Sequence, residues 1–319
     1  MNKQGEAPSG EKWIRDQRDP KNPVDPFRPF HYLIEKERTL KGNVEEVITL
    51  FLTNRECPFT CLMCDLWKNT TDEPVPEGAI PTQIEWGLKQ LPPAPHIKLY
   101  NSASFFDPAA IPPADDPRIA VLLEPFETVV VENHPRMTGE RLFQFAGLIR
   151  PRLQVAMGLE TVHPGGLRQL NKKMEPEDFR RAADALRKKG IGVRAFILLR
   201  PPLLSEKEGI YWAKASLDYA FGAGAECCVV IPTRPGNGAL EQLEKKGQFA
   251  PPQLSSLEQV VEYGIALGRG LVFADTWDLR RFSRCDRCFE ARKNRLEQLN
   301  LQQEILPLIK CTCTDEQTL

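Results

Sequence analysis

The feature of this sequence that most constrains its fold is an alternation of short apolar runs with amphipathic stretches, which begins at Val44. The apolar runs, rich in β-branched residues, predict strands at Val47–Thr53, His96–Tyr100, Thr128–Glu132, Leu153–Leu159, Gly192–Leu199 and Cys227–Pro232. The stretches between and after them predict helices at Pro81–Gln90, Gly139–Ile149, Glu177–Lys189, Ser205–Phe221 and Leu254–Leu267. Such an alternation is typical of βαβ units around a parallel sheet. We therefore predict an α/β fold, a partial (β/α)6 barrel of the TIM type.

The chain divides into three predicted segments. Residues 1–43 are polar and are interrupted by Pro20, Pro23, Pro26 and Pro29, so we expect an irregular arm, packed on the barrel through its aromatic residues. Residues 44–274 form the predicted core barrel. Residues 275–319 are rich in Arg, Glu and Gln and carry four cysteines, which predicts a short C-terminal metal-binding extension.

Composition excludes several classes of protein. The chain has 319 residues, 41% of them hydrophobic and 27% charged, which is ordinary for a globular protein. A formal net charge of -1 excludes a broadly basic nucleic-acid coat, although a local basic patch remains compatible with it. The apolar runs are far shorter than the roughly 20 residues of a membrane span, and residues 1–30 show no secretory signal. We expect a cytoplasmic protein that does not contact membranes.

The nine cysteines fall into groups, and the first group directly follows the first predicted strand. In a reducing compartment such cysteines are metal ligands or catalytic groups before they are disulfides. Cys57, Cys61 and Cys64 have the spacing C-x3-C-x2-C, so three thiolates can converge on one inorganic cluster from a short loop. An iron–sulfur cube usually takes four cysteines, so three would leave one iron open for a ligand. A zinc site that lacks its fourth ligand, or buried structural thiols, are the alternatives.

This spacing after the first strand of a βα array resembles the radical S-adenosylmethionine superfamily. The resemblance implies a 4Fe–4S cluster on Cys57, Cys61 and Cys64, with S-adenosylmethionine bound at the open iron. It also implies reductive cleavage of S-adenosylmethionine to a 5′-deoxyadenosyl radical, and an electron donor such as flavodoxin or ferredoxin. Met63 stands where the superfamily commonly has an aromatic residue.

Further candidate side chains lie where catalytic groups of a parallel βα array gather, at the carboxyl ends of the strands. In the superfamily, a small-residue motif after the second strand binds the amino group of the cofactor, and here Asn101, Ser102 and Ser104 occupy that place. An ordinary turn is the alternative. Gly158-Leu159-Glu160-Thr161 resembles a Gly-x-Glu-Ser/Thr segment of the radical SAM group that includes the elongator acetyltransferase subunit and the tRNA methylthiotransferases. That resemblance implies that Glu160 lies close to the cofactor, and Asn171 and Lys172 are a candidate polar pair facing the site.

Two other charged residues near the predicted strands are candidates. Arg194, near the start of the fifth strand, is predicted to pair with the carboxylate of the cofactor, with a surface salt bridge as the alternative. Glu132, at the end of the third strand, is a candidate for binding a ribose hydroxyl or the substrate, with a solvated loop charge as the alternative. We expect Cys227 and Cys228, inside the sixth strand, to be buried as small hydrophobic residues.

A narrower resemblance rests on three segments of the chain, Gly158–Thr161, Asn171-Lys172 and Phe196–Glu208, together with Asn101–Asp107. They resemble the archaeosine-synthase radical SAM subunit and its uncharacterised relatives, over roughly residues 45–313. The archaeal enzyme converts a lysine-bearing deazaguanine in tRNA to a formamidine, so the resemblance implies tRNA or a nucleotide-like substrate. That group tends to have a longer gap between its first two cysteines, so the resemblance identifies the superfamily without identifying the substrate.

The C-terminal cysteines form a second predicted metal site. Cys285 and Cys288, then Cys311 and Cys313, bracket a helix-like stretch, Phe289–Ile309, and could give four thiolates to one centre. Zinc is the first choice, a second iron–sulfur cluster is the rival, and unrelated thiols are the third alternative. Seven positive residues between Arg280 and Arg295 could contact phosphates, or could form a solvated, salt-bridged helix.

The sequence therefore predicts a radical SAM enzyme that modifies an RNA base. The alternatives are a radical SAM enzyme that acts on a small metabolite or a protein, and a metal-stabilised binding module without turnover. Cleavage of S-adenosylmethionine by the anaerobic protein separates the enzymes from the binding module. Salt-dependent tRNA binding separates the RNA substrate from the others.

Overall fold

The computed structural model describes residues 10–313, and residues 1–9 of the predicted arm and 314–319 of the predicted extension lie outside the described residues. Its strands form one sheet in the order β1 to β8, with β1 antiparallel to β2 and all later neighbours parallel. The strands are β1 (His31–Arg38), β2 (Val44–Phe51), β3 (His96–Tyr100), β4 (Thr128–Glu132), β5 (Arg152–Glu160), β6 (Gly192–Leu199), β7 (Cys227–Pro232) and β8 (Leu271–Ala274). The sheet curls into a half-barrel, so the predicted fold class is confirmed.

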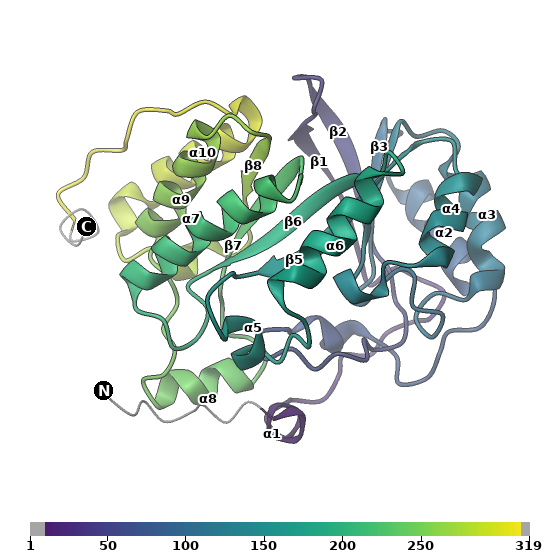
Figure 1. The fold of residues 1–319 in the computed structure, drawn as a ribbon, viewed down its shortest axis with the longest axis horizontal. Helices are drawn as coiled ribbons and strands as arrows, with labels where there is room; N and C mark the ends of the chain where they lie inside the picture. Colours follow the sequence, from purple (N-terminus) through teal and green to yellow (C-terminus); the bar gives the residue numbers. More distant parts are fainter. Residues whose placement is uncertain (1–9, 314–319) are drawn as a thin grey trace.

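Helices flank the strands along the chain (Figure 1). They are α1 (Glu11–Asp16), α2 (Ala79–Gln90), α3 (Asp116–Leu123), α4 (Glu140–Leu148), α5 (Gly166–Gln169), α6 (Pro176–Arg187), α7 (Glu206–Gly222), α8 (Ala239–Lys245), α9 (Leu254–Ala266) and α10 (Asp286–Gln302). Short 3₁₀ helices occur at Leu66–Asn69, Pro113–Asp115, Pro135–Met137 and Leu279–Phe282. Among the described residues, no helix is both long enough and apolar enough to cross a membrane.

Local sequence signals explain where several helices begin. Ser205 accepts a hydrogen bond from the backbone N–H of Glu208, whose side chain accepts one from the Ser205 N–H in return, so a capping box starts α7. Glu175 and Asp178 form the same arrangement at α6. These caps satisfy backbone N–H groups that a helix start would otherwise leave without partners.

Two strands were not predicted, and each has a physical reason. β1 lies inside the segment expected to be an irregular arm, so that expectation is wrong for His31–Arg38. Its residues alternate weakly and include several charges, because β1 is an edge strand and its Glu35 and Glu37 face charged partners. β8 is only four residues long, which is too short for its sequence to show a clear strand pattern. The division of the chain into three segments stays a prediction.

Two hydrophobic clusters position the site. The larger cluster fills the space between the sheet and its outer helices, and it includes Cys228, buried as predicted. The smaller cluster joins α1 and α8 to Leu62, which lies between the first cysteines. Gly238, at the start of α8 with φ +83°, allows this approach, because a Cβ there would lie 1.8 Å from the Gln17 carbonyl oxygen. The loop that carries the first cysteines is therefore packed from behind.

Candidate functional site

A cavity of about 800 Å³ occupies the interior of the half-barrel. A closed TIM barrel fills this space with side chains, but several inward-facing residues here are only half-buried, among them Phe51, Tyr100 and Phe196. Cys57, Cys61 and Cys64 all line this cavity, as the spacing predicts. The structure thus brings the first cysteine group to the carboxyl ends of the parallel strands.

Hydrogen bonds from distant elements hold the cysteine loop in place. The Asn171 side chain donates to the Thr60 carbonyl at 2.6 Å, and the Asn237 side chain donates to the Leu62 carbonyl at 2.6 Å. The Leu62 N–H donates to the Leu170 carbonyl at 2.9 Å. These bonds hold the backbone on both sides of Cys61.

Burial dominates the chemistry of the three thiols. It raises the pKa of Cys57, Cys61 and Cys64 to about 12 each. A cysteine binds metal as a thiolate, and burial alone disfavours that charged form. A cationic centre in the cavity would stabilise the three thiolates. Three soft sulfur donors in one cavity fit the iron of an iron–sulfur cluster.

A buried ion pair lies beside these cysteines. The Lys172 ammonium donates to Glu160 Oε1 at 2.6 Å, and both side chains line the cavity. Although burial opposes the charge, Glu160 and the neighbouring thiols raise the pKa of Lys172. Gly158 leaves room for the pair, since a Cβ there would lie 2.1 Å from Glu160 Oε1. Glu160 itself has φ +61°, a left-handed conformation that turns the chain at the end of β5.

The small residues after β3 are organised by a carboxylate on β4. Glu132 Oε2 accepts hydrogen bonds from the N–H groups of Asn101 and Ser102, at 2.9 and 3.2 Å, and burial raises the pKa of Glu132 to about 7. Ser102 and Ser104 line the cavity. Asn101 is fully buried outside the cavity lining, and neither polar atom of its side chain has a hydrogen-bond partner among the described residues. Of these three predicted ligands, the serines are the better placed.

Arg194 lies far along the cavity from the cysteines. It is the third residue of β6, so it sits near the amino ends of the parallel strands. Its guanidinium donates to Glu37 at 2.5 and 3.2 Å and to Gln154 at 2.8 Å. Although burial opposes ionisation of Glu37, Arg194 and Lys98 lower its pKa to about 2. The pairing of Arg194 with a cofactor carboxylate therefore stays a prediction, and within the structure Glu37 is the carboxylate that the guanidinium binds.

Aromatic side chains that the sequence did not single out also line the cavity. His31, Phe51 and Trp277 contact one another, with ring centroids 5.6 to 6.0 Å apart, and Phe51 and Tyr100 lie 5.9 Å apart. Trp277 is 51% exposed, so it borders the opening of the cavity. These residues come from β1, β2, β3 and the segment after β8, and no local sequence pattern links them.

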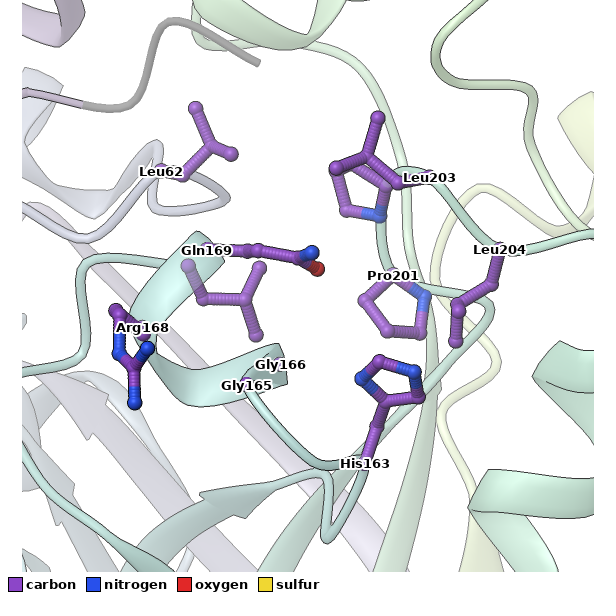
Figure 2. A pocket seen from close by; sticks show the side chains of 11 residues that line it. Leu62, His163, Gly165, Gly166, Arg168, Gln169, Pro201, Leu203 and Leu204 are labelled. Carbon is purple, nitrogen blue, oxygen red and sulfur yellow. The ribbon is translucent and has the colours of Figure 1, made fainter. Parts of the chain in front are cut away.

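A second, smaller cavity of about 290 Å³ lies beside α5 (Figure 2). His163 and Gln169 point into it, and Leu62, Pro201 and Leu203 surround it with apolar groups. No predicted site residue lines this cavity. It borders the back of the cysteine loop through Leu62 and therefore belongs to the packing around that loop.

The C-terminal cysteines converge although 22 residues separate Cys288 from Cys311. The sulfur atoms of Cys285, Cys288, Cys311 and Cys313 all lie within 4.8 Å of one another. Backbone N–H groups of Cys288 and Arg287, at the start of α10, lower the pKa of Cys285 to about 6. The four residues predicted from spacing thus form one group that could hold a metal ion.

The basic stretch splits into buried and exposed residues. Arg292 and Arg295 are buried and paired with Glu258, so they stabilise the packing of α10 on α9. Arg280, Arg281, Arg284 and Arg287 are exposed on the segment between Trp277 and the first turn of α10, although Arg280 pairs with Asp286. Among the arginines of this stretch, the four exposed ones are accessible to phosphates, and the two buried ones are not.

Comparisons with known proteins identify relatives in sequence. No protein-family model matches the chain. An uncharacterized protein of Methanocaldococcus jannaschii is 23% identical over an alignment of 328 positions, gaps included, which covers 95% of this chain and 89% of that protein. Archaeosine synthase subunit beta of Methanosarcina acetivorans is 28% identical over 63% of this chain and 60% of its own length. The same subunit of Thermococcus kodakarensis is 28% identical over 52% of this chain and 53% of its own length. The chain thus matches less than two thirds of each archaeosine synthase subunit.

Solved structures share the fold. Elp3 of Methanocaldococcus infernus, with an N-terminal deletion, has a TM-score of 0.51 and 16% identity over 70% of this chain and 59% of its own. Methylornithine synthase has a TM-score of 0.50 and 14% identity over 70% of this chain and 64% of its own. The predicted resemblance to radical SAM enzymes and to the archaeosine synthase subunit is confirmed, and the relatives are consistent with an enzyme.

Proposed function

We propose that this chain holds a 4Fe–4S cluster on Cys57, Cys61 and Cys64 and cleaves S-adenosylmethionine reductively. The observation that carries the proposal is the convergence of the three thiols and the Glu160–Lys172 pair on one cavity. A bound cluster would supply the electron for this cleavage, which yields a 5′-deoxyadenosyl radical able to remove a hydrogen atom from a substrate. The chain itself would bind and orient S-adenosylmethionine and exclude water.

Cavity residues divide these tasks by position. Ser102 and Ser104 would accept hydrogen bonds from the amino group of S-adenosylmethionine, on a segment that Glu132 holds in place. Glu160 would bind the ribose or the sulfonium side of the cofactor, while its hydrogen bond from Lys172 holds the carboxylate in position. Asn101, buried behind the cavity lining and without a side-chain partner among residues 10–313, would bind an ordered water.

We propose an RNA base as the substrate. The relatives named archaeosine synthase support it, and so do the aromatic rings that line the cavity, since unstacked bases bind to aromatic side chains in single-stranded RNA. The exposed arginines beside Trp277 would contact the phosphates next to that base. We also propose a partner subunit, because those relatives are named as beta subunits, and an electron donor such as flavodoxin or ferredoxin. The four C-terminal cysteines would hold a second metal centre.

The first experiment measures 5′-deoxyadenosine. Protein reconstituted anaerobically with iron and sulfide, then incubated with S-adenosylmethionine and dithionite, is expected to release it. Glu160→Gln should weaken S-adenosylmethionine binding roughly 10-fold at unchanged iron content, because hydrogen bonds to charged groups contribute about 1.5–3 kcal/mol. Glu177→Gln, on the exposed side of α6, is the matched control and should bind normally. A reconstituted protein that contains the cluster but releases no 5′-deoxyadenosine would contradict the proposal.

The second experiment tests the substrate. The reconstituted protein, with S-adenosylmethionine and reductant, is incubated with bulk tRNA, and the nucleosides are analysed by mass spectrometry. A mass change at one modified base, absent when S-adenosylmethionine is omitted, supports the RNA substrate. Cleavage of S-adenosylmethionine without any change in RNA, at low salt and with the partner subunit present, would leave the enzyme class intact and reject the substrate.

A further inference from the structure

Helix α10 runs across the open side of the half-barrel. Its Asn300 pairs with the backbone of Ala274, and Gln303, just beyond its end, pairs with the backbone of Val272. The later residue, Gln303, pairs with the earlier residue of β8, Val272, whereas Asn300 pairs with Ala274. The helix is therefore antiparallel to the strand. Arg38 of β1 also donates to the Leu301 carbonyl. The first turn of α10 therefore lies at the same edge of the sheet as the opening of the main cavity.

The segment after α10 folds back along the helix. Arg295 donates to the carbonyl oxygens of Leu306 and Pro307, at 2.6 and 2.8 Å. This reversal carries Cys311 and Cys313 to Cys285 and Cys288, at the start of the helix.

We propose that Cys285, Cys288, Cys311 and Cys313 bind one zinc ion in a closed tetrahedral site. A Zn–S bond of about 2.3 Å places the sulfur atoms of a tetrahedral site about 3.8 Å apart. The sulfur atoms of Cys285 and Cys311 are 3.8 Å apart, and so are those of Cys288 and Cys313. All four lie within 4.8 Å, so the geometry is that of a site for a single ion.

The same distances argue against the other assignments. Four thiolates that each bind a different iron of a cube must be separated by the width of the cube, and these four are too close together. A disulfide would need sulfur atoms about 2.05 Å apart. Zinc with four thiolates carries a charge of 2−, and Arg292, which interacts with Cys288, and Arg287, close to Thr312, would offset it.

The ion would hold the returning segment against the start of α10. Beyond the contacts of Arg295, residues 304–313 have no regular secondary structure, so a metal tie would supply much of their order. It would also fix the turn from Leu279 to Cys285, which carries exposed arginines beside the opening of the cavity. This inference does not rest on the proposed radical chemistry, because its ligands are separate from Cys57, Cys61 and Cys64.

The test uses the full chain with Cys57, Cys61 and Cys64 replaced by Ala, so that iron at the first site does not interfere. Elemental analysis should find about one equivalent of zinc and little iron. Replacing Cys311 and Cys313 by Ser in this protein should lower the zinc at least 10-fold, whereas Cys228→Ala, a buried thiol in β7, should leave it unchanged. Hydrogen exchange of the original chain, before and after zinc extraction, should show faster exchange in 304–313 while β5 and β6 remain protected.

Each result decides the proposal. Zinc that disappears with the Cys311 and Cys313 substitutions, together with faster exchange of the tail, supports the site. Several irons per chain, or one iron with thiolate-to-iron absorption, would overturn the assignment to zinc. A metal-free protein whose segment 304–313 is nevertheless protected from exchange would show that the four thiols are only packed together.

Discussion

Burial determines the chemistry of the main cavity residue by residue. It raises the pKa of the three thiols after β2 and of Glu132, whereas the carboxylate of Glu160 raises the pKa of the buried Lys172. Arg194 is likewise buried, but Glu37 already neutralises it. Both ion pairs are buried, and they differ in position: Glu160 and Lys172 lie beside the cysteines, whereas Arg194 lies near the amino ends of the parallel strands.

Cys57, Cys61 and Cys64 provide the first prediction at this scale. Replacement of any one by Ala should lower 5′-deoxyadenosine release at least 100-fold, because two thiolates do not hold a cube with one open iron. Cys227→Ala, a buried cysteine in β7, serves as the control and should retain the wild-type iron content. Wild-type release from a variant of the first group would contradict the assignment of these ligands.

Arg194 provides the second prediction. Arg194→Ala should lower the free energy of unfolding by about 3 kcal/mol, because it leaves the carboxylate of Glu37 buried with only Lys98 as partner. Urea unfolding measures this loss, and Arg180→Ala, in an exposed pair on α6, should change little. Unchanged stability together with weaker S-adenosylmethionine binding would instead indicate a cofactor ligand.

The pH dependence of that cluster provides the third prediction. The pKa of Glu37 is about 2 in the folded chain and near 4.3 in an unfolded one, so its contribution is complete above about pH 5 and is lost as the pH falls toward 2. The wild type should therefore lose stability between pH 5 and pH 2.5 more steeply than Glu37→Gln. Parallel stability curves for the two proteins would contradict the low pKa.

At the scale of elements, the two ends of the sheet are protected in different ways. β1 carries charged residues on its edge, whereas β8 is covered by α10. The Asn300 side chain accepts from the N–H of Ala274 at 2.7 Å and donates to its carbonyl at 2.9 Å, as a neighbouring strand would. Gln303 repeats the arrangement on Val272. Side-chain amides thus satisfy the backbone groups of an edge strand that would otherwise be open to association.

Asn300 provides the prediction at this scale. Asn300→Ala should lower the free energy of unfolding by about 1–3 kcal/mol, because it leaves two backbone groups of β8 without their partner. Hydrogen exchange at Ala274 should become faster. Gln298→Ala, on the exposed side of the same helix, is the control and should change neither property. Equal exchange rates at Ala274 in both variants would mean that the amide contributes nothing to the strand edge.

At the scale of the whole molecule, the open half-barrel leaves a cavity that side chains would fill in a closed barrel. Exposed arginines lie on the segment between Trp277 and the first turn of α10. The net charge is only -1, so the proposed RNA binding would depend on local groups, and the exposed arginines beside Trp277 are one such group. A binding surface of this kind should show its charge in the salt dependence of affinity.

Arg284 and Arg287 provide the prediction at this scale. If each of these arginines makes one phosphate contact, as the proposed RNA substrate implies, replacing both by Ser should weaken tRNA binding and reduce the slope of log K against log salt by about 2. Filter binding at several salt concentrations measures the slope. Arg180 and Arg181, on α6, are the matched control pair, and their replacement by Ser should leave it unchanged. An unaltered slope in the first variant would exclude this surface from RNA binding.

The sequence by itself determined the parallel βα architecture, six of the strands and both cysteine groups, because hydrophobic periodicity and cysteine spacing are local properties of the chain. The family resemblance predicted that Glu160 lies close to the cofactor and that Lys172 faces the site, and both side chains line the cavity that the cysteines line. Only the tertiary structure decided the partner of Arg194, since Glu37 lies 157 residues away on a strand with weak alternation. The aromatic lining of the cavity and the fourfold sulfur contact likewise depend on which distant segments meet. The curl of the sheet brings the aromatic residues together, and the chain reversal after α10 brings the four cysteines together. No local sequence pattern predicts either arrangement.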